Sequence, residues 1–153
     1  MRHRRDKSSF WRQATAALLF CGGLIAWFVR AETRPLNRDE LKIEVSDLRS
    51  FVAAGTLLVQ QAASGKITRV YFETQTDLLQ DKAETAMKSL DKSQVAPGLE
   101  VKHWRARQMA SQTNTALEKL YGSFERSPEM NSVKGDLEKL LPQLKELEES
   151  LKG

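Results

Sequence analysis

An uncharged run near the N-terminus divides the chain into two parts with different residue patterns. It extends from Ala14 to Val29. As a helix it would measure about 24 Å, against roughly 30 Å of bilayer hydrocarbon. Arg12 and Arg30 flank the run, and their long side chains can reach the polar interface from inside a bilayer. Beyond it, apolar residues recur with the period of an amphipathic helix. The pattern predicts a transmembrane anchor over residues 13–30, followed by an all-α domain.

Tryptophans and basic residues around this run indicate its role and orientation. Trp11 and Trp27 lie where membrane proteins carry their aromatic belts. Basic residues are concentrated in residues 1–12, which predicts a cytoplasmic tail and a periplasmic or otherwise extracytoplasmic domain. The expected location is therefore the inner (plasma) membrane. A cleaved signal peptide is the alternative, and cleavage near Ala31 would release a secreted soluble bundle.

Four amphipathic segments of similar length follow a short linker at residues 31–36. A capping box, formed by Asn37 and Glu40, opens the first segment. Pro97 and Gly98 break the chain after the second segment, and Ser127 is the expected N-cap of the fourth. The helices are expected at about 38–63, 66–92, 99–124 and 129–151. Matched lengths and short connections predict an antiparallel, up-down-up-down four-helix bundle over residues 37–153.

The first and fourth helices carry the most regular apolar seams, with steps of three and four residues. In the first helix the seam consists of Leu41, Val45, Leu48, Val52, Gly55, Val59 and Ala62. In the fourth it consists of Met130, Val133, Leu137, Leu140, Leu144, Leu147 and Leu151. The third helix is polar over residues 108–115. The second helix has a weaker stripe, which consists of Ile67, Val70, Tyr71, Thr74 and Leu78, then Leu79, Ala83, Ala86 and Leu90. Such seams pack helices within one chain or, as in a coiled coil, between chains.

The joint between the first two helices leaves two architectures open. Gly65 can take the left-handed conformation that ends a helix, which would produce a tight reversal and a four-helix bundle. A continuous helix through Gly65 would instead form a rod of about 80 Å. The rod would expose its apolar seam and would need a partner chain, so a homo-oligomer is among the expected partners.

The basic character of the chain belongs to its N-terminus. The sequence has 24 Lys and Arg against 20 Asp and Glu, a formal charge of +4. Residues 1–30 hold six basic residues and one acidic residue, so they carry +5 and the remaining chain carries −1. A nucleic-acid-binding domain usually carries a basic stripe on its folded surface. The distribution therefore argues against a nucleic-acid partner.

The residues needed for most catalytic and metal sites are scarce. Cys21 is the single cysteine, and His3 and His103 are the two histidines. Multi-cysteine metal sites, disulfides within the chain and two-histidine di-iron sites are therefore excluded within one domain. The sequence also lacks phosphate-binding loops, hydrolase elbows and zinc-protease motifs. We expect no enzymatic activity, no catalytic or metal site, and no cofactor.

One dense basic cluster remains as a candidate docking patch. It consists of Lys102, His103, Trp104, Arg105 and Arg107. It would suit an acidic partner or a lipid headgroup, whereas the alternative is an ordinary solvated helix turn. The polar residues that follow it would either fix helix register or line a small-ligand pocket.

The combined pattern predicts a membrane-anchored, non-enzymatic helical bundle. It would act through an unidentified protein partner, as a subunit, scaffold or accessory factor, with membrane lipid as its other partner. An extracytoplasmic ligand-binding or sensing bundle is the alternative function.

Overall fold

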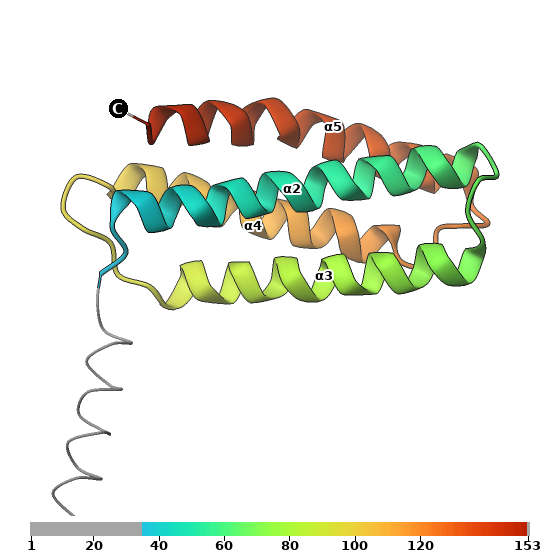
Figure 1. Cartoon of the computed structure of the whole chain (residues 1–153), viewed down its shortest axis with the longest axis horizontal. Coiled ribbons are helices and arrows are strands. Elements are labelled where there is room, and N and C mark those ends of the chain that lie inside the picture. The colour runs from blue at the N-terminus through green and yellow to red at the C-terminus, as the bar shows by residue number, and fades with distance from the viewer. Residues whose placement is uncertain (1–34, 153) are drawn as a thin grey trace, which may run out of the picture. The chain divides into compact units, whose positions relative to one another are not determined.

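The computed structural model of the chain describes residues 35–152, and this part is all-α with four helices and no strand (Figure 1). The helices are α2 (Arg38–Ala63), α3 (Arg69–Lys92), α4 (Glu100–Leu120) and α5 (Ser127–Ser150). None of these four helices is long and apolar enough to cross a membrane. The anchor predicted over residues 13–30, with its flanking tryptophans and arginines, lies outside the described residues.

Successive helices run in opposite directions and form one bundle (Figure 1). α2 packs against α3 and α5, and α4 packs against the same two helices from the opposite corner. Their apolar stripes meet in a single core. The prediction of a four-helix, all-α domain is therefore confirmed.

The chain enters the bundle beside the loop that connects α3 and α4. Leu36 and Val95 form an isolated parallel bridge. In it, the backbone N–H of Leu36 donates to the carbonyl of Gln94 at 2.7 Å, and that of Ala96 donates to the carbonyl of Leu36 at 3.0 Å. The start of α2, the α3–α4 loop and the end of α5 lie at the same end of the bundle (Figure 1).

The two ends of α2 explain why its length was predictable. Asn37 accepts from the backbone N–H of Glu40 at 2.9 Å, and the Glu40 carboxylate accepts from the N–H of Asn37 at 2.8 Å. At the other end, Gly65 has a φ of +66°, which favours glycine because a Cβ is penalised there. The chain reverses at this point, and the continuous rod is excluded. α3 begins at Arg69 rather than 66, because Thr68 caps it by accepting from the N–H of Tyr71.

The regular seams predicted for α2 and α5 pack inside the bundle. Every predicted seam residue of α5 is buried, and in α2 only Ala62 is partly exposed. Gly55 permits close packing, since a Cβ there would lie 3.0 Å from a methyl carbon of Leu117 and 3.2 Å from one of Leu137. α2 thereby approaches both α4 and α5.

The stripe predicted for the first half of α3 is wrong. Val70, Tyr71 and Leu78 are exposed. The buried residues of this half are Phe72 and Thr76, and the seam continues through Leu79, Ala83, Ala86 and Leu90, as predicted. A threonine is tolerated in this seam because the Thr76 hydroxyl donates to the carbonyl of Phe72 at 2.8 Å.

The connection between α4 and α5 also differs from the prediction. α4 ends at Leu120 rather than 124, and Phe124 folds back so that its ring centroid lies 5.4 Å from that of Phe72. Ser123 is buried in the turn, and its hydroxyl donates to the carbonyl of Leu120 at 2.7 Å. α5 starts at Ser127, so this serine is the first helical residue and not the N-cap, which is Arg126.

Candidate functional site

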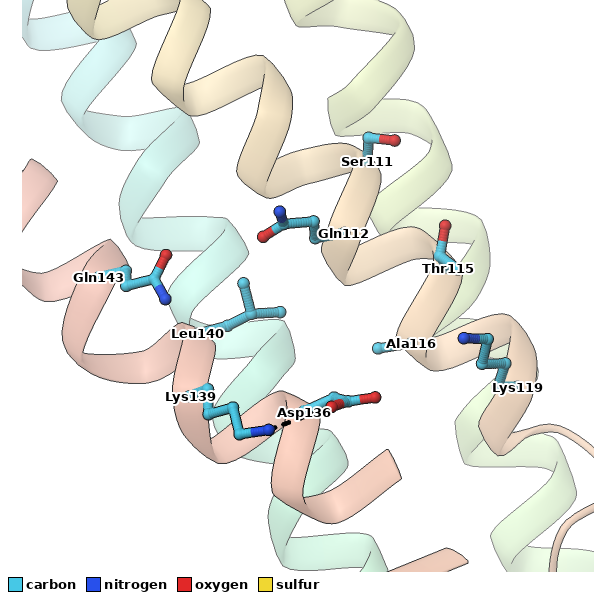
Figure 2. A pocket seen from close by; sticks show the side chains of 9 residues that line it. All are labelled: Ser111, Gln112, Thr115, Ala116, Lys119, Asp136, Lys139, Leu140 and Gln143. Atoms are coloured by element: carbon cyan, nitrogen blue, oxygen red, sulfur yellow. Dashed lines mark ion pairs between the residues drawn. The ribbon is translucent and has the colours of Figure 1, made fainter. Parts of the chain in front are cut away.

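An open groove runs between α4 and α5, with a volume of about 340 Å³ (Figure 2). It is lined by Ser111, Gln112, Thr115, Ala116, Lys119, Asp136, Lys139, Leu140 and Gln143. The lining comes from the middle and far part of the bundle, away from the end where the chain enters (Figure 1). The groove therefore lies away from the start of α2.

A difference in side-chain size produces the groove. α4 presents Ala116 to α5, where Leu140 faces it, and both are almost fully buried. The short alanine side chain leaves space that a larger residue would fill. Gln112 and Gln143 project toward one another from the two helices, above this apolar floor (Figure 2). Each amide group can donate and accept hydrogen bonds, so this rim suits the backbone N–H and C=O groups of a bound polypeptide.

Charged side chains gather at one end of the groove. Lys139 forms an ion pair with Asp136, with 3.7 Å between its Nζ and the carboxylate Oδ1. Lys119 extends from α4 toward the same end (Figure 2). Two lysines near one aspartate give this end of the groove a net positive charge, which favours an acidic group on a bound molecule. Ser111 lies two helical turns from Lys119, about 12 Å along the axis, so the two do not form a nucleophile–base pair.

The polar residues predicted on the third helix separate into two groups. Ser111, Gln112 and Thr115 are exposed and line the groove. Thr113 is fully buried in the core, and Asn114 is partly buried beside it. Within the described part of the chain, Thr113 Oγ1 and Asn114 Oδ1 are buried and have no hydrogen-bond partner. The polar stretch therefore contributes both to a core layer and to a surface groove.

His103 does not belong to the predicted docking patch, because it is buried between helices. Its side chain is 9% exposed, and its Nε2 lies 2.9 Å from the carbonyl oxygen of Leu90 on α3. The ring nitrogen there donates to the carbonyl. The spacing of Leu99, His103, Ala106 and Ala110 follows a helical seam, and this signal in the sequence could have located the histidine.

The remaining cations of the predicted patch point to different neighbours. The ammonium group of Lys102 donates to the backbone carbonyl of Ser150, and Arg105 lies 3.9 Å from the carboxylate of Glu146, both on the α5 side. Arg107 pairs with Asp91 at 2.6 Å, at the end of α3. The structure thus does not bring the five predicted residues into one basic surface.

Trp104, the aromatic member of this group, is exposed, with 60% of its surface accessible. Val101, one turn earlier, is 72% exposed and was not predicted as part of any site. Among residues 35–152, no three His, Cys, Asp or Glu side chains lie close enough to hold a metal ion.

No family model, curated protein or solved structure matches this chain. Its function is therefore inferred from its own residues and surfaces.

Proposed function

We propose that this protein is a membrane-anchored, non-enzymatic helical bundle that binds another protein through the groove between α4 and α5. The observation that carries the proposal is the composition of that groove. It combines the apolar floor of Ala116 and Leu140 with the amide rim of Gln112 and Gln143. A partner segment with an apolar side chain and an acidic group would fill the floor and pair with the lysine end.

The internal use of the apolar seams supports binding through the outer surface. All four helices bury their stripes in the core of one chain, including the heptad seam of α5. A coiled-coil contact through these seams would require the bundle to open. A second copy of the chain, if it binds, would therefore meet this one through surface residues.

The proposed location rests on the sequence pattern of the first thirty residues. The uncharged run, its flanking tryptophans and its basic leader favour an anchor with the N-terminus in the cytoplasm. The bundle would then lie on the outer side of the inner membrane. A nucleic-acid partner is not proposed, because the basic charge lies in this leader and not on the bundle.

A small-ligand or sensing function is the second candidate, and one observation favours it. Ser111, Gln112 and Thr115 place hydroxyl and amide groups along the same groove. Its volume of about 340 Å³ lies at the lower end of the range for small-molecule sites. If the groove binds a small ligand and no protein, a photoreactive residue placed in it would form no crosslink to another protein.

The proposed function can be tested by crosslinking from the groove in intact membranes. A photoreactive amino acid replaces Gln112 in the full-length tagged protein, and matched variants carry it at Gln143 or at Gln60. Gln60 is an exposed glutamine of α2 outside the groove. We expect the same protein adduct from Gln112 and Gln143, and none from Gln60, after purification in detergent and mass spectrometry. Equal adducts from all three positions would show that capture is not specific to the groove.

Two further measurements test the anchor and its orientation. We expect the full-length chain to stay in the membrane fraction during carbonate extraction, and release of a shortened soluble chain would reject the anchor. A reporter that works only outside the cytoplasm is fused after Gly153 and should be active. Activity of a cytoplasmic reporter at the same position would reverse the topology.

A further inference from the structure

An exposed apolar pair occupies the outer face of α4 at its first turns. Val101 and Trp104 are three residues apart on the helix, so their side chains are neighbours. They are 72% and 60% exposed, respectively. Water-exposed tryptophan and valine side by side form a small apolar surface that the bundle core does not cover.

Two arginines border this surface on opposite sides. Arg105 follows Val101 by four residues and faces α5, whereas Arg107 follows Trp104 by three residues and faces α3. Both side chains are about half exposed. The ion pair of Arg105 with Glu146 spans 3.9 Å between solvent-exposed groups, and such surface pairs contribute little to stability. This guanidinium can therefore exchange its partner for another anion.

The position of the pair in the fold connects it to the predicted anchor. Leu36 is bonded to Gln94 and Ala96 in the loop before α4, so the chain enters the bundle beside the start of this helix. Trp104 lies about 6 Å along the axis from the first residue of α4. Residues 31–34 separate the predicted anchor from the described part and span at most about 14 Å when extended.

We propose that Val101 and Trp104 contact the interface of the bilayer that holds the anchor, with Arg105 and Arg107 facing the phosphates of its anionic lipids. This proposal rests on the membrane anchor of the proposed function. With the anchor in a bilayer, a linker of four residues would hold this end of the bundle near the lipid surface. Tryptophan is enriched at such interfaces because its ring has an apolar body and a polar N–H group. Arginine pairs with phosphate through its planar donor fork. The contact would hold the bundle in one orientation, with its α4–α5 groove at a fixed height above the membrane.

Quenching of Trp104 fluorescence by brominated lipids tests this contact. The chain has three tryptophans, so Trp11→Phe and Trp27→Phe leave Trp104 as the sole tryptophan in the full-length protein. This protein is reconstituted in vesicles of phosphatidylcholine and phosphatidylglycerol, with or without bromine on the acyl chains. The matched control adds Trp104→Phe and Leu57→Trp. Leu57 is an exposed apolar residue of α2, about 28 Å along the axis from the start of that helix.

We expect the bromine quenching of Trp104 to exceed that of the Leu57→Trp control by roughly twofold or more, because tryptophan at the interface lies near the acyl chains. Arg105→Gln with Arg107→Gln should reduce the quenching in vesicles that contain phosphatidylglycerol and leave it unchanged in phosphatidylcholine alone. Equal quenching at both positions, in a protein that resists carbonate extraction, would overturn the lipid contact and leave the anchor intact. Release by carbonate would instead reject the anchor and, with it, the contact.

Discussion

The bundle has two sides that differ in the size and polarity of their buried residues. The α2–α5 side buries mainly large aliphatic residues, such as Leu48 of α2 and Leu144 of α5. The α3–α4 side buries many alanines, together with Thr76, His103 and Thr113. Large aliphatic side chains remove the most apolar surface from water, so the α2–α5 side is expected to supply most of the stability. The α3–α4 side also contains a polar contact between its two helices, from His103 to the carbonyl of Leu90.

The same difference explains where the candidate surfaces lie. The alanines of α4 fill little space, and Ala116 leaves a groove opposite Leu140 of α5. The outer residues of α4 include hydroxyls, amides and Trp104. On α2 and α5, by contrast, the regular seams are absorbed by the core. α4 thus lines both candidate surfaces, and α5 combines a buried aliphatic seam with one wall of the groove.

The largest expected effect comes from truncation of the aliphatic side. Leu144→Ala removes a fully buried side chain of α5 and should lower the free energy of unfolding by about 2–5 kcal/mol. Ala110→Gly, at a fully buried position of α4, should cost only about 1–2 kcal/mol through helix propensity and one lost methyl group. Unfolding of the full chain in mild detergent, followed by circular dichroism, measures both. A larger loss for Ala110→Gly would reverse the comparison between the two sides.

Helix number and the aliphatic seams were predictable from local patterns. The α2 seam has a period that only a helix satisfies, and Asn37 with Glu40 marks its start through a bond within one turn. The α3 stripe was not predictable to the same degree. Its true seam contains Thr76, which is polar by composition and becomes compatible with the core only through its bond to a backbone carbonyl. Tyr71 and Leu78, each next to a residue of the true seam, form a second apolar stripe with the same helical spacing, so the sequence pattern did not distinguish the two.

The candidate surfaces were less predictable than the fold. The basic run of α4 was visible in the sequence, but adjacent residues on a helix face different directions, and the run divides among α3, α5 and the core. His103 therefore became a buried residue and Arg107 a partner of α3. The groove depends on the match of Ala116 to Leu140, which are distant in sequence. Which residues of α4 and α5 lie opposite each other depends on how the two helices pack, and the local sequence pattern does not determine this.

The turn that joins the two sides gives the second prediction. Gly65 has a φ of +66°, and Gly65→Ala places a Cβ in the left-handed region at a cost of about 1–2 kcal/mol. The matched control is Gly135→Ala within α5, where a Cβ would meet nothing within 4 Å. That change should stabilise by about 1 kcal/mol, since alanine has the higher helix propensity. Thermal unfolding compares the two variants, and a higher melting temperature for Gly65→Ala would contradict the reversal between α2 and α3.

Polar groups within the α3–α4 side give the third prediction. Thr113→Val replaces a buried hydroxyl without a partner in the described residues by a methyl group of similar shape, and should stabilise by about 1 kcal/mol. Thr76→Val removes a hydroxyl that is bonded to the carbonyl of Phe72, so it should give a smaller gain or a loss. Urea unfolding of both variants measures the difference. Equal gains would show that the Thr76 bond contributes nothing to this side.

The smallest expected effect concerns Glu44, whose carboxylate accepts from the Ser89 hydroxyl at 3.0 Å and so links α2 to α3. Burial raises the pKa of Glu44 above its ordinary value near 4.5, the Ser89 bond lowers it, and the charge of Asp47 raises it. Because the folded protein holds this proton more tightly than the unfolded chain, stability falls as the pH rises from about 4.5 through the raised pKa.

Glu44→Gln removes the fall in stability with rising pH and keeps a side-chain oxygen that accepts from the Ser89 hydroxyl. The variant should therefore match the native protein in acid, below both pKa values, and be slightly more stable at neutral pH. Ser89→Ala should act in the opposite direction, because without the hydroxyl the charged form of Glu44 loses its partner and the decline with pH becomes steeper. Unfolding measured across this pH range, with the double variant as control, separates the two contributions. A gain for Glu44→Gln that is the same in acid and at neutral pH would show that titration of Glu44 does not weaken the junction between the two sides.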